Sequence, residues 1–369
     1  MARVTVVDWA AAIRSGQRLA PTGPKLSVGQ ARQAVEDLRE FSARAELIVR
    51  DTTGLGHGLP VAQARVVDRP GWVAATAAGM ELLTQPLTEK MAARLTTKST
   101  KSTGRHARTG RDQAADGSSI DEKALRRASK IAGTQLGSVL AFLSGRVLGQ
   151  YDPVIGEGTA AGPGLLLLVA PNVVKVEREL DADPQDFRMW VCLHESTHRL
   201  QFTAVPWLRD YFRSLVGELA EQADVQVGEL LKRAVAAIGG RNGSFVEAIQ
   251  SPGQRAVFDR MMALMTLLEG HADHVMDAVG PSVIPSVGRI RTGFTRRRQQ
   301  TRGPIDRLIR ALLGLDMKMA QYATGAAFVS AVVDRVGMER FNTIWTAPHT
   351  LPTRAETKDP DAWITRVLS

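Results

Sequence analysis

The most chemically distinctive stretch of this chain is His194-Glu195-Ser196-Thr197-His198, in which two histidines carry the spacing His-Glu-x-x-His. We expect this stretch to lie on a helix, because Asp183 can cap it, Pro184 suits its first position and Pro206 ends it. Residues four apart share a face of a helix, so the two imidazoles point the same way about one turn apart. They can bind one zinc ion, with Glu195 close enough to reach a water molecule on it.

Apolar neighbours predict that this helix is buried. They are Phe187, Trp190, Val191 and Leu193. Buried polar groups cost free energy when they are unpaired, so the histidines and the glutamate need partners. A metal ion is one such partner, and hydrogen bonds within an ordinary core are the alternative. We expect Cys192 to be a small buried hydrophobic residue and not a ligand.

A zinc site needs a third protein ligand and an open position for water. The pattern His-Glu-x-x-His-x-x-Gly-x-x-His is excluded, because Gln201 and Ala204 occupy its last two positions. The other option is Glu269, on a helix expected over about residues 252–279. Asp273 follows on the same face and is expected to accept a hydrogen bond from a ligating imidazole, which fixes its tautomer. A solvated helix face is the alternative, but the preceding turns are nearly all apolar.

A family resemblance supports this metal site. Glu-x-x-x-Asp after His-Glu-x-x-His resembles the gluzincin pattern of metallopeptidases. Outside residues 97–120, the chain resembles a zincin-like family of actinobacterial proteins, described as zinc-dependent metalloproteases or as associated with biosynthesis of a deazaflavin coenzyme. The resemblance implies a zincin-like fold and a zinc site. It is carried by residues 190–202, 205–208, 268–277 and 350–353.

One departure from the gluzincin pattern concerns the third ligand. Seventy residues separate His198 from Glu269. In ordinary gluzincins this glutamate follows the second histidine at a much shorter separation in the sequence. The expected function is nevertheless that of a metallopeptidase, in which zinc-activated water attacks a carbonyl group and Glu195 is the general base. Two alternatives stay open. One is a hydrolase or accessory protein of coenzyme biosynthesis that acts on a small molecule, and the other is a zinc-binding protein without turnover.

Hydrolysis also needs a proton donor or second electrophile for the developing oxyanion. Candidates are His271, His274, Tyr211, Tyr322 and an arginine between residues 289 and 298. Spacing does not choose among them, and the two histidines can instead form hydrogen bonds at a helix interface.

Composition indicates a soluble cytoplasmic protein. The chain has 369 residues, a mass of 40.0 kDa and 44% hydrophobic residues, which is ample for a core. Its start does not read as a secretory signal, and its longest apolar run, residues 165–170, is too short to span a membrane. The single cysteine excludes an internal disulfide. The oligomeric state is not indicated.

The net charge of +9 is local. Residues 97–111 carry +5 and residues 289–302 carry +6, so the rest of the chain sums to −2. The first patch has no aromatic residue and the second has only Phe294, so a stacking platform for bases is absent. We therefore expect no specific binding of nucleic acid, and a peptide or small molecule as substrate.

Helical spacing dominates the chain and predicts a mainly α fold with a small β-sheet, in one zincin-like domain over residues 1–369. Residues 97–120 are polar and basic, and we expect a disordered insertion there. The glycine-rich residues 155–164 precede an apolar run instead of following a strand, so they do not form a phosphate loop. That run, Leu165–Val169, is expected to be a strand, which either pairs with an extended substrate or is purely structural.

Overall fold

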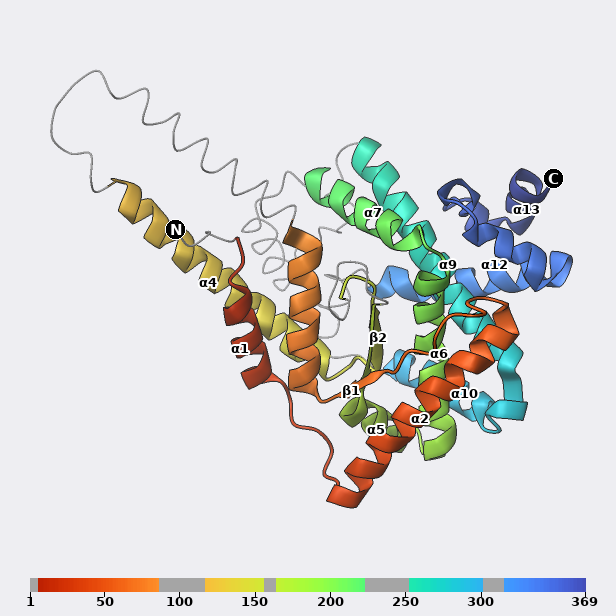
Figure 1. Ribbon diagram of the computed structural model, residues 1–369, viewed down its shortest axis with the longest axis horizontal. Helices are drawn as coiled ribbons and strands as arrows, with labels where there is room; N and C mark the ends of the chain where they lie inside the picture. Colours follow the sequence, from red (N-terminus) through yellow and green to blue (C-terminus); the bar gives the residue numbers. More distant parts are fainter. Residues whose placement is uncertain (1–5, 86–116, 156–163, 223–251, 301–314) are drawn as a thin grey trace. The chain divides into compact units, whose positions relative to one another are not determined.

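The computed structural model describes residues 6–85, 117–155, 164–222, 252–300 and 315–369 (Figure 1). Helices dominate these residues and the strands form one small sheet, so the predicted fold class is confirmed. Every helix in the described ranges is too short or too polar to cross a membrane. Residues 97–116 of the expected insertion lie outside these ranges, and residues 117–120 begin a helix.

The chain forms two compact units. The first comprises Met1–Ser27 and Val66–Asn172, and the second comprises Val28–Arg65 and Val173–Ser369. The expectation of one domain over the whole chain stays a prediction.

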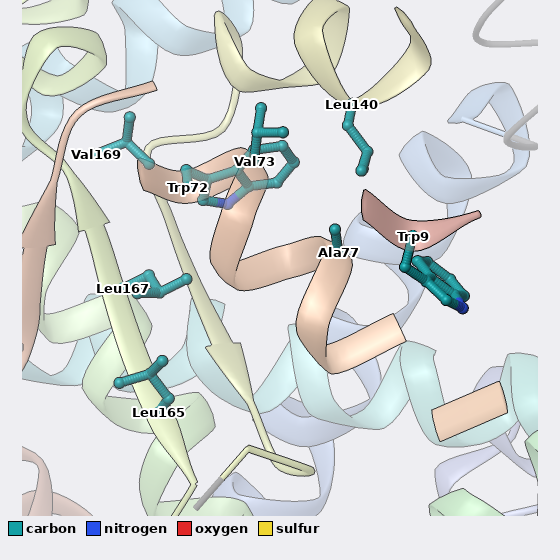
Figure 2. Close-up of a cluster of buried hydrophobic side chains, with 8 residues drawn as sticks. All are labelled: Trp9, Trp72, Val73, Ala77, Leu140, Leu165, Leu167 and Val169. Carbon is teal, nitrogen blue, oxygen red and sulfur yellow. The ribbon is translucent and has the colours of Figure 1, made fainter. Parts of the chain in front are cut away.

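A small sheet and three helices build the first unit. The helices are α1 (Trp9–Leu19), one over residues 69–85, and α4 (Gly117–Ser144), and the strands are β1 (Arg65–Val67), β2 (Gly149–Asp152) and β3 (Leu165–Val169). Asp8 caps α1 by accepting a hydrogen bond from the Ala11 amide at 2.8 Å. The core brings side chains of the helices and of β3 together (Figure 2), namely Trp9, Trp72, Val73, Ala77, Leu140, Leu165, Leu167 and Val169.

Strand β3 lies in the middle of the sheet, whose order is β1-β3-β2. Its pairing with β2 is antiparallel, with Gly149 opposite Leu168 and Asp152 opposite Leu165. All five residues of β3 are buried. An extended peptide adds to an exposed sheet edge, and β3 has a strand on each side. The expectation that Leu165–Val169 pairs with a substrate is therefore wrong.

The second unit is helical. Its α-helices are α2 (Val28–Thr53), α5 (Ala170–Glu179, which starts at the boundary), α6 (Pro184–Ala204), α7 (Leu208–Gln222), α9 (Pro252–Val283), α10 (Val287–Gln300), α12 (Leu315–Phe341) and α13 (Pro360–Leu368). Residues 289–300 of the second basic patch lie on α10. Three short 3-10 helices follow α12, namely η2 (Asn342–Trp345), η3 (Pro348–Thr350) and η4 (Glu356–Lys358).

Helix α6 begins and ends where the sequence predicts. The carboxylate of Asp183 accepts hydrogen bonds from the amides of Gln185 and Asp186 at 2.9 and 3.1 Å, and Pro184 is the first helical residue. Such a cap satisfies amide groups that have no partner inside the helix.

Two buried arginines fix α6 against its neighbours. Arg188 donates to Asp37 of α2 at 2.6 Å and to both carboxylate oxygens of Glu177 of α5 at 2.8 and 3.0 Å. Three turns later, Arg199 forms an ion pair with Glu46 of α2. Buried charges are tolerated when they are paired and hydrogen-bonded, so these contacts set both the rotation and the register of α6. His194 and His198 lie about a third of a turn around the helix from this face.

Two glycines let α9 and α12 cross in backbone contact. A Cβ atom added to Gly270 would lie 2.1 Å from the carbonyl carbon of Gly325, and one added to Gly325 would lie 2.1 Å from the Thr266 carbonyl oxygen. Side chains of any size would separate the helices. Because Gly270 directly follows Glu269, this crossing also determines where Glu269 lies.

Replacing Gly270 with alanine tests this crossing. Because the new methyl group would overlap the α12 backbone, we expect the free energy of unfolding to fall by about 1–3 kcal/mol or more, measured by urea denaturation. Gly217→Ala in α7 is the matched control. Its Cβ atom would meet nothing within 4 Å, so we expect no loss, or a gain of about 0.5–1 kcal/mol. Equal stability of Gly270→Ala and the wild type would contradict the crossing.

Candidate metal centre

Three side chains from two helices converge at one point. His194 and His198 come from α6 and Glu269 comes from α9, and their ligand atoms all lie within 4.8 Å of one another. The two Nε2 atoms are 3.2 Å apart, and Oε2 of Glu269 lies 3.7 Å from Nε2 of His194 and 3.5 Å from Nε2 of His198. Within the described part of the chain, no other group of His, Cys, Asp and Glu side chains has this arrangement.

The spacing of these atoms fits a small tetrahedral cation. Zinc binds nitrogen and oxygen ligands at about 2.0–2.1 Å, which places neighbouring donor atoms about 3.4 Å apart. The observed separations of 3.2, 3.5 and 3.7 Å bracket this value. Two imidazoles and one carboxylate are a ligand set of catalytic zinc sites, in which a fourth position stays open. The three residues therefore fit zinc.

The charges around this point favour a cation. Burial raises the pKa of Glu195 to about 7, with the neighbouring Glu269 adding to the shift and His198 opposing it. Burial disfavours a charged His198, but Glu269, Glu195 and Gln201 outweigh it and raise the pKa of His198 to about 9. Without a metal, the carboxylates thus stabilise an added proton, and a bound cation can take over that role.

Glu195 lies next to the ligand trio without belonging to it. Its side chain is buried, at 8% exposure. One residue on a helix corresponds to a rotation of about 100°, so Glu195 leans away from the direction shared by the two histidines. This position suits a group that contacts a water molecule beside the metal and does not bind the metal itself.

Gln201 contacts a candidate ligand that the sequence did not link to it. This fully buried side chain lies three residues after His198, and its Oε1 atom is 3.0 Å from Nδ1 of His198. Its Nε2 atom is 2.9 Å from the Leu268 carbonyl oxygen and 3.0 Å from Nδ1 of His271. The spacing of three residues between His198 and Gln201 could have indicated this contact, because residues three apart on a helix are neighbours. In the sequence, Gln201 was used only to exclude the pattern His-Glu-x-x-His-x-x-Gly-x-x-His.

An aromatic stack borders His194. The ring of Trp190 lies parallel to His194, with centroids 6.3 Å apart, and Phe294 of α10 lies on Trp190 at 4.7 Å. Phe187 stacks against both aromatic rings. Helix α10 therefore contributes an aromatic side chain, Phe294, beside the candidate metal ligands. One of its arginines, Arg291, donates to Asp277 of α9 at 2.8 Å.

His271, a candidate oxyanion stabiliser, is fully enclosed. Burial, with His274 and His198, lowers its pKa to about 3, so it is neutral. Its ring stacks on Phe341 at 5.6 Å and meets Trp345 edge-on at 5.4 Å. Its Nδ1 atom contacts Gln201, which in turn contacts His198. An oxyanion role of His271 stays a prediction.

The remaining histidine and tyrosine candidates lie on three helices, and the arginine candidates lie on α10. Nδ1 of His274 is 3.0 Å from Oγ of Ser330 on α12, and burial lowers the His274 pKa. Tyr211 lies on α7, where burial raises its pKa against the effect of Arg260. Tyr322 belongs to α12, but its side chain lies outside the described part of the structure. The oxyanion roles of these residues stay predictions.

Asp273 and Cys192 were also singled out by the sequence. Asp273 is partly buried one turn after Glu269, and its carbonyl group accepts a hydrogen bond from Arg291 at 3.1 Å. Its role in orienting a ligand stays a prediction. Cys192 is buried, with Sγ 3.7 Å from the Leu38 carbonyl oxygen, and burial raises its thiol pKa, aided by Glu195. It is the buried small residue that was expected.

Comparisons with known proteins agree with this centre. A sequence profile described as zincin-like metallopeptidase matches residues 7–364. A crystal structure from Chloroflexus aurantiacus, described as a proposed hydrolase with a novel fold, is 32% identical, has a TM-score of 0.65 and covers 98% of each chain. No curated protein matches the chain.

Metal analysis tests the ligand trio. We expect purified protein to carry about one zinc per chain, because three protein ligands form one site. His194→Ala, His198→Ala and Glu269→Ala should each lose this zinc on dialysis. Glu179→Gln is the control, because Glu179 is an exposed carboxylate 3.7 Å from Lys175, and it should keep the metal. Full zinc content in Glu269→Ala would refute the assignment of the third ligand.

Proposed function

This chain belongs to the zincin-like metallopeptidase family, and from that premise we propose that it is a zinc-dependent hydrolase of peptide or amide bonds. The observation that carries the proposal is the convergence of His194, His198 and Glu269 beside the buried carboxylate of Glu195. The family and the crystal structure support a metallohydrolase. The choice of a peptide or amide bond is ours, drawn from the chemistry of this residue set.

In the proposed reaction, Glu195 is the general base. Bound zinc supplies Lewis acidity, which polarises a carbonyl group and makes water nucleophilic near neutral pH. Glu195 takes one proton from the attacking water as its oxygen bonds to the carbonyl carbon. When the carbon–nitrogen bond breaks, the protonated Glu195 returns that proton to the leaving amine. The products are a carboxylic acid and an amine, and Glu195 is again a carboxylate.

The surroundings of the trio support these separate roles. Gln201 contacts His198 and Trp190 stacks on His194, so both imidazoles are held in place before a substrate arrives. A general base must reach the proton that it removes, and Glu195 shares its helix turn with the first ligand. Preorganised groups of this kind lower the cost of reaching the transition state.

Glu195→Gln separates the base from the ligands. Glutamine keeps the size and hydrogen bonding of the side chain but cannot accept the proton, so zinc content should stay close to wild type. Hydrolysis of a peptide found by library screening should fall by about 10²–10⁴-fold. Zinc content and initial rates are measured on the same samples, with Glu218→Gln on α7 as the control.

Four outcomes would change the proposal. Loss of zinc from Glu195→Gln would make Glu195 a ligand, and full turnover would remove it as the base. If small amides are cleaved and peptides are not, the substrate is a small molecule. If zinc-loaded wild type cleaves neither class, the chain is a zinc-binding protein without turnover.

A further inference from the structure

We propose that Gln201 is a positioning residue that holds His198 in the tautomer needed to bind a metal, and that the backbone carbonyl of Leu268 sets the direction of the Gln201 amide. The inference rests on the proposed function only in taking His198 as a metal ligand. Everything else follows from which atoms can donate and which can accept a hydrogen bond.

The first step is the direction of the amide. Glutamine has one end that only donates, the NH₂ group, and one end that only accepts, the carbonyl oxygen. The Leu268 carbonyl oxygen can only accept, and it lies 2.9 Å from the Gln201 side chain. The NH₂ group must therefore face Leu268, which turns the oxygen of Gln201 away from it.

The second step concerns His198. The Gln201 oxygen lies 3.0 Å from Nδ1 of His198 and can only accept, so Nδ1 must carry a proton. In the neutral ring the lone pair is then on Nε2. This atom is the one that faces the other two ligands, 3.2 Å from Nε2 of His194 and 3.5 Å from Oε2 of Glu269.

The third step extends the chain of hydrogen bonds to His271. The second proton of the NH₂ group points to Nδ1 of His271 at 3.0 Å, so this nitrogen must be the acceptor. The proton of the neutral His271 ring is then on Nε2. The direction of hydrogen bonding therefore runs from His198 through Gln201 to His271, with Leu268 as the fixed reference.

Burial makes the hydrogen bonds of Gln201 and His271 hard to replace with bonds to water. Gln201 and His271 are both fully buried, and a buried donor or acceptor that loses its partner destabilises the native state. Leu268 directly precedes Glu269, so the same amide joins the helix of two ligands to the helix of the third. Gln201 thus couples the tautomer of His198 to the distance between α6 and α9.

Gln201→Met tests the coupling, because methionine keeps the length of the side chain and removes both hydrogen-bonding ends. We expect the folded variant to bind zinc about 10–100-fold more weakly than wild type in a competition titration. The visible absorption of the cobalt-substituted protein should change as well. Thr203→Val is the matched control on the same helix. It removes a hydroxyl group that donates to the Arg199 carbonyl at 2.9 Å, and should leave zinc affinity and cobalt spectrum unchanged.

Gln201→Glu is the second variant. A carboxylate can still accept from His198 but has no proton for the Leu268 carbonyl, so this variant should also lose zinc affinity. If both folded variants keep wild-type zinc affinity and cobalt spectrum, Gln201 is not a positioning residue.

A measurement on metal-free wild type decides the direction of the amide independently. Nitrogen-15 NMR of the histidine rings should show His271 with a bare Nδ1 and a protonated Nε2. The opposite tautomer would overturn the inference, even if Gln201→Met fails to fold. If wild type binds no zinc, the proposed function fails, while this tautomer still decides the direction of the Gln201 amide.

Discussion

The burial of helix α6 is the constraint on which the rest of the structure depends. Its polar side chains are enclosed, and a buried polar or charged group is costly unless another group meets it. Arg188 and Arg199 meet carboxylates of α2 and α5 on one face. On another face, Gln201 meets α9. The positions of the neighbouring helices therefore follow from pairing the buried polar groups of α6. These same contacts place the candidate metal ligands.

The sequence predicted the parts of the site that depend on local rules. A capping aspartate, a first-turn proline and a four-residue spacing define α6 and its histidines, and the apolar turns before Glu269 define α9. Gln201 was missed because two of its three partners, Leu268 and His271, lie 67 and 70 residues away, beyond the reach of periodicity. Only its contact with His198 is local. The central place of β3 was missed because β1 and β2 have only three and four residues, too few for a clear alternating pattern.

Two segments that carry the family resemblance, residues 205–208 and 350–353, are linked to His271 through aromatic side chains. Trp207 donates through Nε1 to the Trp345 carbonyl at 2.9 Å, and the Trp345 ring lies against His271. Further along, Trp363 donates to the Thr350 carbonyl at 2.8 Å and packs on Phe341. The end of the chain thus supports a histidine that binds no metal in our proposal. Gln201 links this histidine to His198.

The long separation between His198 and Glu269 has a thermodynamic consequence. In the unfolded chain two imidazoles remain close in sequence, but the carboxylate is a distant group that binds only after a large loop has closed. Under the proposed function, the complete trio would exist in the native state alone, and zinc binding would be linked to folding by mass action. At a free zinc concentration of 100 times the dissociation constant, this linkage would add about 2.7 kcal/mol to the stability of the native state. Bound zinc would then cross-link α6 and α9, and a chelator would act on the protein as a mild denaturant.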